Sequence, residues 1–267
     1  MVSPRQVGSV LAAIGFALFA VLVYLVKQQQ DGVCNALFPS NCGSGRRVAV
    51  AGDGKHNKRR EKIVLSKELK DKATGIIIPR HKKFGKSELT CLGVGVRAKS
   101  IAVANINVYS VGLYVDDKPA RHALKKFGDD DPLKLKNDES VFNALGAHNS
   151  FGGGFKKYLH LVFARPVAAT KVVDALTTVK DVDKKVLARF SSITLEAIGN
   201  SIHKGETVSL GWEGKDKMVV MVRDKLAGIV TDPHLPKAVF DLYLGSKPVS
   251  PAAKAAFALG VPDFLAS

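Results

Sequence analysis

A long uncharged run near the N-terminus constrains this chain more than any other feature of its sequence. From Val7 to Val26 it reads VGSVLAAIGFALFAVLVYLV, between Arg5 and Lys27. A helix rises about 1.5 Å per residue, so about 20 apolar residues span the roughly 30 Å hydrocarbon layer of a membrane. A cleaved signal peptide has a shorter apolar region and a more basic start. We therefore predict a transmembrane anchor over residues 1–27, uncleaved or like a mitochondrial presequence, in a single-pass protein of a mitochondrial or other organelle membrane.

The basic charge of the chain lies mostly beside this run. The formal net charge is +16, and between Arg46 and Lys86 there are 14 Lys and Arg residues against four acidic residues. Basic residues next to a membrane are attracted to anionic head groups by about 1 kcal/mol each. A solvated linker, charged only for solubility, explains the run equally well. Nucleic acid ranks below both, because aromatic residues make up only 7% of the chain and no zinc-finger, basic-zipper or RNA-sheet signature occurs. We predict a polar linker over residues 28–86, a membrane as partner and no nucleic acid.

Residues 87–267 form the predicted folded domain, because strand and helix patterns follow one another there. The order of strands, helices, strands and helices indicates an α+β fold, with helices on one face of a mainly antiparallel sheet. The predicted elements are strands at 89–100 and 101–117, a helix from 119, a strand at 155–165, helices at 166–176 and 181–198, strands at 206–214, 216–224 and 226–230, and helices at 235–245 and 251–260.

The spacing of the candidate residues does not indicate a metal or nucleotide site. The seven histidines show no HExxH or paired ligand spacing, and the three cysteines are too few and too widely spaced for a zinc site. The glycines at 152–154 lack the Lys-Ser/Thr of a phosphate-binding loop. We predict no metal and no cofactor from these patterns.

Three blocks of the predicted domain together resemble the chalcone isomerase-like superfamily. They are Gly93-Val-Gly-Val-Arg97, the strand at 107–116, and the helix at 238–245 with 248–251 after it. The resemblance covers roughly residue 87 to the C-terminus. It implies an open-faced β-sandwich with a ligand cleft between the large sheet and the helical layer. The superfamily includes plant isomerases that close a flavanone ring, non-catalytic relatives that bind fatty acids, and membrane-anchored mitochondrial members for which haem binding has been proposed.

The functions within the superfamily differ in their site residues, and the resemblance matches those residues to positions in this sequence. It matches the arginine that orients the isomerase substrate to Arg97, but it places the catalytic threonine at Tyr109. The tyrosine and asparagine of the isomerases fall near Ala168 and Ala175, and the polar residue of the late helix falls near Leu242. Without these polar groups nothing positions the water or the reacting oxygens, which weakens an isomerase function.

The residues that remain in the motifs imply a carboxylate-binding site. In the fatty-acid-binding relatives an arginine and a tyrosine from these motifs hold the carboxylate, and they correspond here to Arg97 and Tyr109. An apolar cleft would take the acyl chain, and each methylene contributes about 0.8 kcal/mol on burial. The residues predicted to line this cleft are Val94, Val108, Val111 and Leu242.

We therefore predict a non-catalytic protein that binds a fatty acid or a similar small hydrophobic carboxylate. An isomerase that uses Arg97 as its catalytic residue is the alternative. A haem-binding mitochondrial membrane protein is the third hypothesis, with His160 as the candidate ligand. Each residue also has a purely structural explanation: Arg97 in an ion pair with an acid, Tyr109 as a half-buried strand residue, and His160 as a core histidine.

Overall fold

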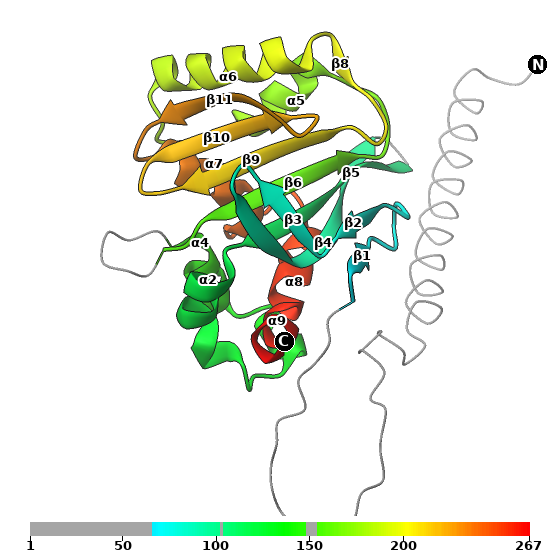
Figure 1. Ribbon diagram of the computed structural model, residues 1–267. Helices are drawn as coiled ribbons and strands as arrows, with labels where there is room; N and C mark the ends of the chain where they lie inside the picture. Colours follow the sequence, from blue (N-terminus) through cyan, green and yellow to red (C-terminus); the bar gives the residue numbers. More distant parts are fainter. Residues whose placement is uncertain (1–65, 102–103, 148–153) are drawn as a thin grey trace, which may run out of the picture. The chain divides into compact units, whose positions relative to one another are not determined.

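The fold is organised around one antiparallel sheet (Figure 1). A computed structural model describes residues 66–101, 104–147 and 154–267, and seven strands within these ranges pair in the spatial order β11-β10-β9-β6-β5-β4-β3. These strands are β3 (His81–Phe84), β4 (Ser87–Ile101), β5 (Ala104–Val115), β6 (Lys157–Phe163), β9 (Thr207–Glu213), β10 (Lys217–Val222) and β11 (Lys225–Thr231). Two short antiparallel pairs accompany the sheet: β1 (Glu68–Lys70) with β2 (Ile77–Pro79), and β7 (Val167–Ala168) with β8 (Ser201–Ile202).

The helices pack on one face of this sheet. Each helix of the described ranges contributes side chains to the larger core cluster, together with Val111, Leu113 and Val115 from β5. A smaller cluster on the opposite face is built from strand residues, among them Phe84 and Tyr114. The helices are α2 (Asp117–Leu124), the 3-10 helix η1 (Lys125–Phe127), α3 (Pro132–Leu135), α4 (Glu139–Gly146), α5 (Ala169–Leu176), α6 (Lys184–Ile198), α7 (Leu235–Leu244), α8 (Pro251–Leu259) and α9 (Val261–Ala266).

This arrangement confirms the predicted α+β class with an antiparallel sheet covered by helices. Strand β6 shows how the sequence encodes it. Leu159 and Leu161 belong to the helix-facing cluster, whereas Tyr158 and His160, which alternate with them, face the aromatic side chains of the other cluster. Both faces of this central strand are therefore buried.

The folded part begins earlier than predicted. Strands β1, β2 and β3 lie in residues 66–86, which the sequence analysis assigned to the polar linker. Ile78 and Phe84 are 2% and 1% exposed, and they pack against Tyr114 on the outer face of the sheet. The linker prediction was wrong for these residues, because the surrounding lysines give the segment the composition of a linker although its few apolar side chains are buried.

The predicted anchor over residues 1–27, and the predicted linker as far as residue 65, lie outside the described residues. Within the residues that the structure does describe, no helix combines the length and the apolar character that a membrane span needs. The anchor therefore stays a prediction from the sequence.

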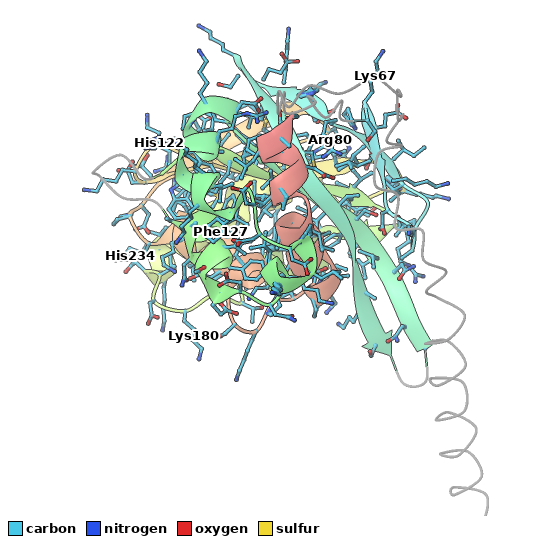
Figure 2. The ribbon with its side chains drawn as sticks, turned by 90° about the horizontal axis from the view of Figure 1, so that it is seen from below. Lys67, Arg80, His122, Phe127, Lys180 and His234 are labelled. Atoms are coloured by element: carbon cyan, nitrogen blue, oxygen red, sulfur yellow. The ribbon has the colours of Figure 1, made fainter. Side chains whose placement is uncertain are left out.

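Helix α8 lies directly against strand β4 (Figure 2). The strand carries glycine at two alternate positions, 93 and 95. A Cβ atom added to Gly95 would lie 2.6 Å from the Cα of Ala253, and one added to Gly93 would lie 2.2 Å from the carbonyl oxygen of Ala256. Neither distance leaves room for a side chain. The two glycines therefore allow the helix to pack with its backbone against the backbone of the strand.

Replacing Gly95 by valine is expected to destabilise the fold strongly, because the new side chain would overlap the backbone of α8. Overpacking costs about 1–3 kcal/mol even where side chains can yield, so urea denaturation should show a loss of at least about 2 kcal/mol in the free energy of unfolding. Gly146→Ala is the control, because a Cβ atom there meets nothing closer than 3.9 Å. Equal stability of the two variants would contradict the close contact.

One lysine is buried at the end of helix α4. Lys157 is 0% exposed, and its Nζ donates to the carbonyl oxygens of Leu145 at 2.7 Å and Ala147 at 2.8 Å. The rings of Phe155 and Trp212 lie 4.6 and 4.7 Å from the same nitrogen. Burial lowers the pKa of Lys157 to about 7. The lysine thus satisfies the last carbonyl groups of the helix, and its charged form is disfavoured by the loss of solvent.

The free energy of unfolding should rise with pH because of Lys157. Between pH 7 and about 10.4, the ordinary pKa of lysine, the unfolded chain holds a proton on this amine that the folded protein has lost. Stability therefore increases across this window, by up to about 1.4 kcal/mol per pH unit. The difference between the native protein and Lys157→Met, measured by urea denaturation at pH 7 and pH 9.5, should grow accordingly. Lys215→Met, at an exposed position, is the matched control, and a constant difference for Lys157→Met would show that the amine stays charged.

Candidate functional site

Arg97 reaches the helical side of the sheet because it continues the alternation of Gly93 and Gly95 along β4. The strand register places it opposite Tyr109 on β5, directly before an irregularity in the pairing of the two strands. Its Nη1 donates to the Oη of Tyr109 over 3.3 Å, and its Cζ lies 5.6 Å from the centroid of the Tyr109 ring. The guanidinium, which is half-buried, therefore contacts the phenol through both the hydroxyl and the ring.

A second tyrosine completes this cluster. The hydroxyl oxygens of Tyr109 and Tyr243 are 2.6 Å apart, and either can be the donor. The two side chains are 4% and 0% exposed. Burial raises the pKa of Tyr109, against the opposing effect of Arg97, and burial raises the pKa of Tyr243 well above its ordinary value. Both phenols are therefore neutral at physiological pH, and Arg97 supplies the charge of the cluster.

The sequence analysis missed Tyr243 and named its neighbour Leu242. On α7 the side chains of Leu235, Val239 and Tyr243 are spaced by four residues and are all buried, whereas Leu242 is only partly buried. This four-residue spacing is the signal that would have assigned Tyr243 to the inner face of the helix.

Arg97 has no acidic partner among the described residues. Its hydrogen-bond partner in these ranges is the neutral phenol of Tyr109, and no ion pair involves it there. A buried or half-buried cation is usually paired with a carboxylate, because removing it from water is costly. The ion-pair explanation of Arg97 therefore does not apply within the described part of the chain, and most of its five N–H donors remain available to a ligand.

The space beside Arg97 comprises an inner cavity and an outer groove, and both are lined by residues of β4, β5 and helix α5. Inside the fold, a cavity of about 30 Å³ touches Arg97, Tyr109 and Val172, and a cavity of this size holds roughly one or two water molecules. Outside it, a groove of about 510 Å³ runs beside the strands β4 and β5 and along α5, from Pro166 before the helix to Thr178 after it. The residues shared by the cavity and the groove are Arg97, Val108, Val167, Lys171 and Ala175.

The structure brings three of the predicted site residues together and separates the other three from them. Arg97, Tyr109 and Val108 surround the inner cavity. Val94 packs in the cluster on the opposite face of the sheet, because it alternates with Gly93 and Gly95. Val111 is 0% exposed within the core, and Leu242 lines a different surface pocket beside α7.

Comparisons with known proteins agree with this fold. The sequence pattern of the chalcone isomerase-like family matches residues 70–257, which is more than half of the chain. The chain belongs to the chalcone isomerase-like family. Among solved structures, the crystal structure of a fatty-acid binding protein from Arabidopsis thaliana is similar, with a TM-score of 0.60 and 21% identity, over 74% of this chain and 98% of that one. This likeness shows a common fold. Among curated proteins, none matches the chain.

His160 lies on the other side of the sheet of this chalcone isomerase-like domain. Its ring is 3% exposed, its Nδ1 is 2.8 Å from the hydroxyl of Ser209, and the rings of Phe84 and Tyr114 pack edge-on against it. Burial lowers its pKa to about 4. In the described ranges, no group of three or more His, Cys, Asp or Glu side chains is placed to hold a metal ion. Haem ligation by His160 stays a prediction, and this histidine does not face Arg97.

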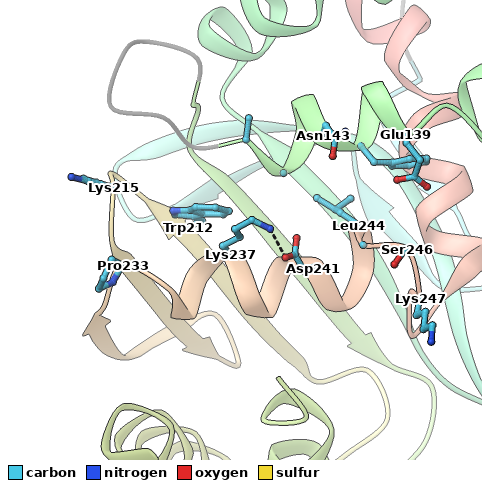
Figure 3. A pocket seen from close by; sticks show the side chains of 14 residues that line it. Glu139, Asn143, Trp212, Lys215, Pro233, Lys237, Asp241, Leu244, Ser246 and Lys247 are labelled. Atoms are coloured by element: carbon cyan, nitrogen blue, oxygen red, sulfur yellow. Dashed lines mark hydrogen bonds and ion pairs between the residues drawn. The ribbon is translucent and has the colours of Figure 1, made fainter. Parts of the chain in front are cut away.

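A larger pocket of the domain also lies away from Arg97 (Figure 3). It has a volume of about 710 Å³ and lies between α4 and α7, with Trp212 from β9 in its wall. Lys237 and Asp241, one turn apart on α7, form an ion pair beside it. Neither Arg97 nor the two tyrosines line this pocket, so it is separate from the candidate site.

A double-mutant cycle is expected to show that the two site tyrosines are energetically coupled. Tyr109→Phe and Tyr243→Phe should each lower the free energy of unfolding by about 1 kcal/mol, because either change removes the same buried hydrogen bond. The double variant should therefore lose less than the sum of the two, with a coupling of about 0.5 kcal/mol or more, measured by urea denaturation. The control cycle combines Tyr109→Phe with Tyr114→Phe, whose hydroxyl donates to Pro79 on the other face, and it should be additive. Additivity in both cycles would refute the direct bond.

Proposed function

We propose that this chain binds a fatty acid or a similar small hydrophobic carboxylate at Arg97 and does not catalyse a reaction on it. The observation that carries this proposal is the half-buried guanidinium of Arg97, which has no carboxylate partner among the described residues. A ligand carboxylate would provide the missing counter-ion.

The chemistry of the cluster suits an anion. A planar guanidinium presents parallel N–H groups that match the two oxygens of a carboxylate, and such charge-assisted bonds are roughly twice as strong as neutral ones. The neutral hydroxyl of Tyr109 accepts from Arg97, and it can donate its own proton to a ligand when Tyr243 is the donor of the bond between the two tyrosines. The Tyr109–Tyr243 pair thus holds the guanidinium in place without neutralising it.

The groove outside α5 offers apolar side chains for the rest of the ligand. Its volume of about 510 Å³ falls within the roughly 300–1,000 Å³ of small-molecule sites. Each methylene placed against its apolar wall contributes up to about 0.8 kcal/mol. The apolar residues of this wall are Ile106, Val108, Pro166, Val167 and Ala175.

A binding function without catalysis fits the side chains that surround Arg97. The positions that carry polar catalytic groups in the isomerases correspond by resemblance to Tyr109, Ala168 and Ala175, and near Leu242. Ala175 lines both the groove and the inner cavity with a methyl group only. The similar Arabidopsis structure, which its title describes as a fatty-acid binding protein, supports the same choice.

Replacing Arg97 by glutamine should weaken fatty-acid binding by about 10- to 100-fold, because a hydrogen bond to a charged group contributes about 1.5–3 kcal/mol. Displacement of a fluorescent fatty acid by oleate, with the purified full-length chain, measures this loss. Glutamine retains donors for Tyr109, so the fold should persist. Arg189→Gln, which removes the same charge from the exposed surface of α6, is the matched control and should bind oleate like the native protein.

Two results would refute the proposal. Oleate binding that is equally strong in Arg97→Gln and in the native protein would mean that Arg97 does not hold the carboxylate. Loss of chalcone absorbance faster than the spontaneous rate, abolished in Arg97→Gln, would instead show an isomerase.

A further inference from the structure

Four cations converge on the groove outside α5. Arg97 and Lys99 come from β4, Arg165 follows β6, and Lys171 lies on α5, so three separate segments of the chain contribute them. The groove has one acidic lining residue, Asp174. The lining therefore carries a formal charge of +3, which is more than a single carboxylate would neutralise.

Little of this charge is compensated within the described ranges. Lys171 approaches Asp174 at 4.0 Å, but their side chains are 75% and 69% exposed, and such a pair contributes little. Lys99 and Arg165 are exposed and form no ion pair with a described residue. Arg223 shows the paired case, because its Nε lies 2.7 Å from an oxygen of Glu206.

The start of helix α5 adds to the positive potential of the groove. The helix begins at Ala169, and its N-cap residue Ala168 provides no side-chain cap. Pro166 and Val167 before it, and Lys171 in its first turn, all line the groove. The positive end of a helix dipole favours an anion, and here it supports the cations without being a site by itself.

We propose that the groove binds a single-chain lipid whose headgroup carries a phosphate monoester. This inference rests on the proposed function, because it places the acyl chain against the same apolar wall of the groove and the anionic headgroup beside the same Arg97. A phosphate monoester carries about −1.5 to −2 charges at neutral pH and three acceptor oxygens, so it can engage cations from several directions at once. Lys99, Arg165 and Lys171 contact the phosphate, and Arg97 holds the oxygen nearest to Tyr109. A fatty acid uses only the Arg97 part of this arrangement.

Competition between two ligands with the same acyl chain tests this inference. In displacement experiments on the purified chain in about 150 mM salt, 1-oleoyl lysophosphatidate should bind about tenfold more tightly than oleate, because its phosphate forms several further ion pairs that are each weak at an exposed site. The double variant Lys99→Gln/Arg165→Gln should lose this preference, because it weakens binding of lysophosphatidate about tenfold more than binding of oleate. The double variant Lys185→Gln/Arg189→Gln removes two exposed cations from α6 and should keep the preference.

The outcomes separate this inference from the proposed function. If oleate binds and lysophosphatidate binds no more tightly, the phosphate-binding role of the groove is wrong, although the proposed function stands. If neither lipid binds, the proposed function fails and this inference fails with it. A preference that persists in Lys99→Gln/Arg165→Gln would place the phosphate elsewhere. Competition by inorganic phosphate at the concentration that suffices for lysophosphatidate would show that the ligand is free phosphate and not a lipid.

Discussion

The contact between strand β4 and helix α8 is the constraint on which the site depends. Three glycines make it possible, because a Cβ atom at Gly93, Gly95 or Gly260 would collide with backbone atoms of the opposing segment at 2.2, 2.6 and 1.8 Å. These residues allow α8 to cover the strand up to Gly95. Arg97 is the next residue on the same face, and it is therefore the first side chain that can project beyond the helix. The Gly93-Val-Gly-Val-Arg97 motif, which by resemblance indicates ligand binding, therefore also determines how α8 packs on β4. This packing leaves Arg97 as a lining residue of the groove.

Much of the fold was accessible from the sequence, because its longer elements carry clear periodic patterns. The strands β9, β10 and β11 and the helices α6, α7 and α8 lie where alternation, prolines and terminal glycines predicted them. Strands β1 to β3 were missed because they bury few side chains, such as Ile78 and Phe84. These side chains show no regular spacing among the many lysines of the segment. The short helices α3, α4 and α9 were missed for the same reason: four to eight residues provide too few repeats to show a helical face.

The residue types that give the site its chemistry could be predicted from the sequence. The contacts that depend on packing could not. Arg97 and Tyr109 come from motifs, and their contact follows from strand pairing. Val94 was assigned to the same cleft although strand alternation directs it to the opposite face. The 2.6 Å contact of Tyr109 with Tyr243 joins residues 134 positions apart, so no local pattern reveals it. The small size of the inner cavity depends on how Val172 and its neighbours fill the interior, and the sequence alone does not reveal this packing.

The nearly filled interior limits where an acyl chain can lie. The cavity at Tyr109 accepts about one or two waters, and its walls are close-packed side chains of β6 and α5. A chain that entered there would have to displace α5, whose position is secured by its contacts with α6, by the two-residue pairing of β7 with β8, and by a 3.0 Å bond from the Ala169 amide to the Asn200 carbonyl. A chain that lay in the outer groove would displace only water. Because Arg97 lines both spaces, it can hold the same anion in either arrangement, and the groove is the one that requires no rearrangement of the core.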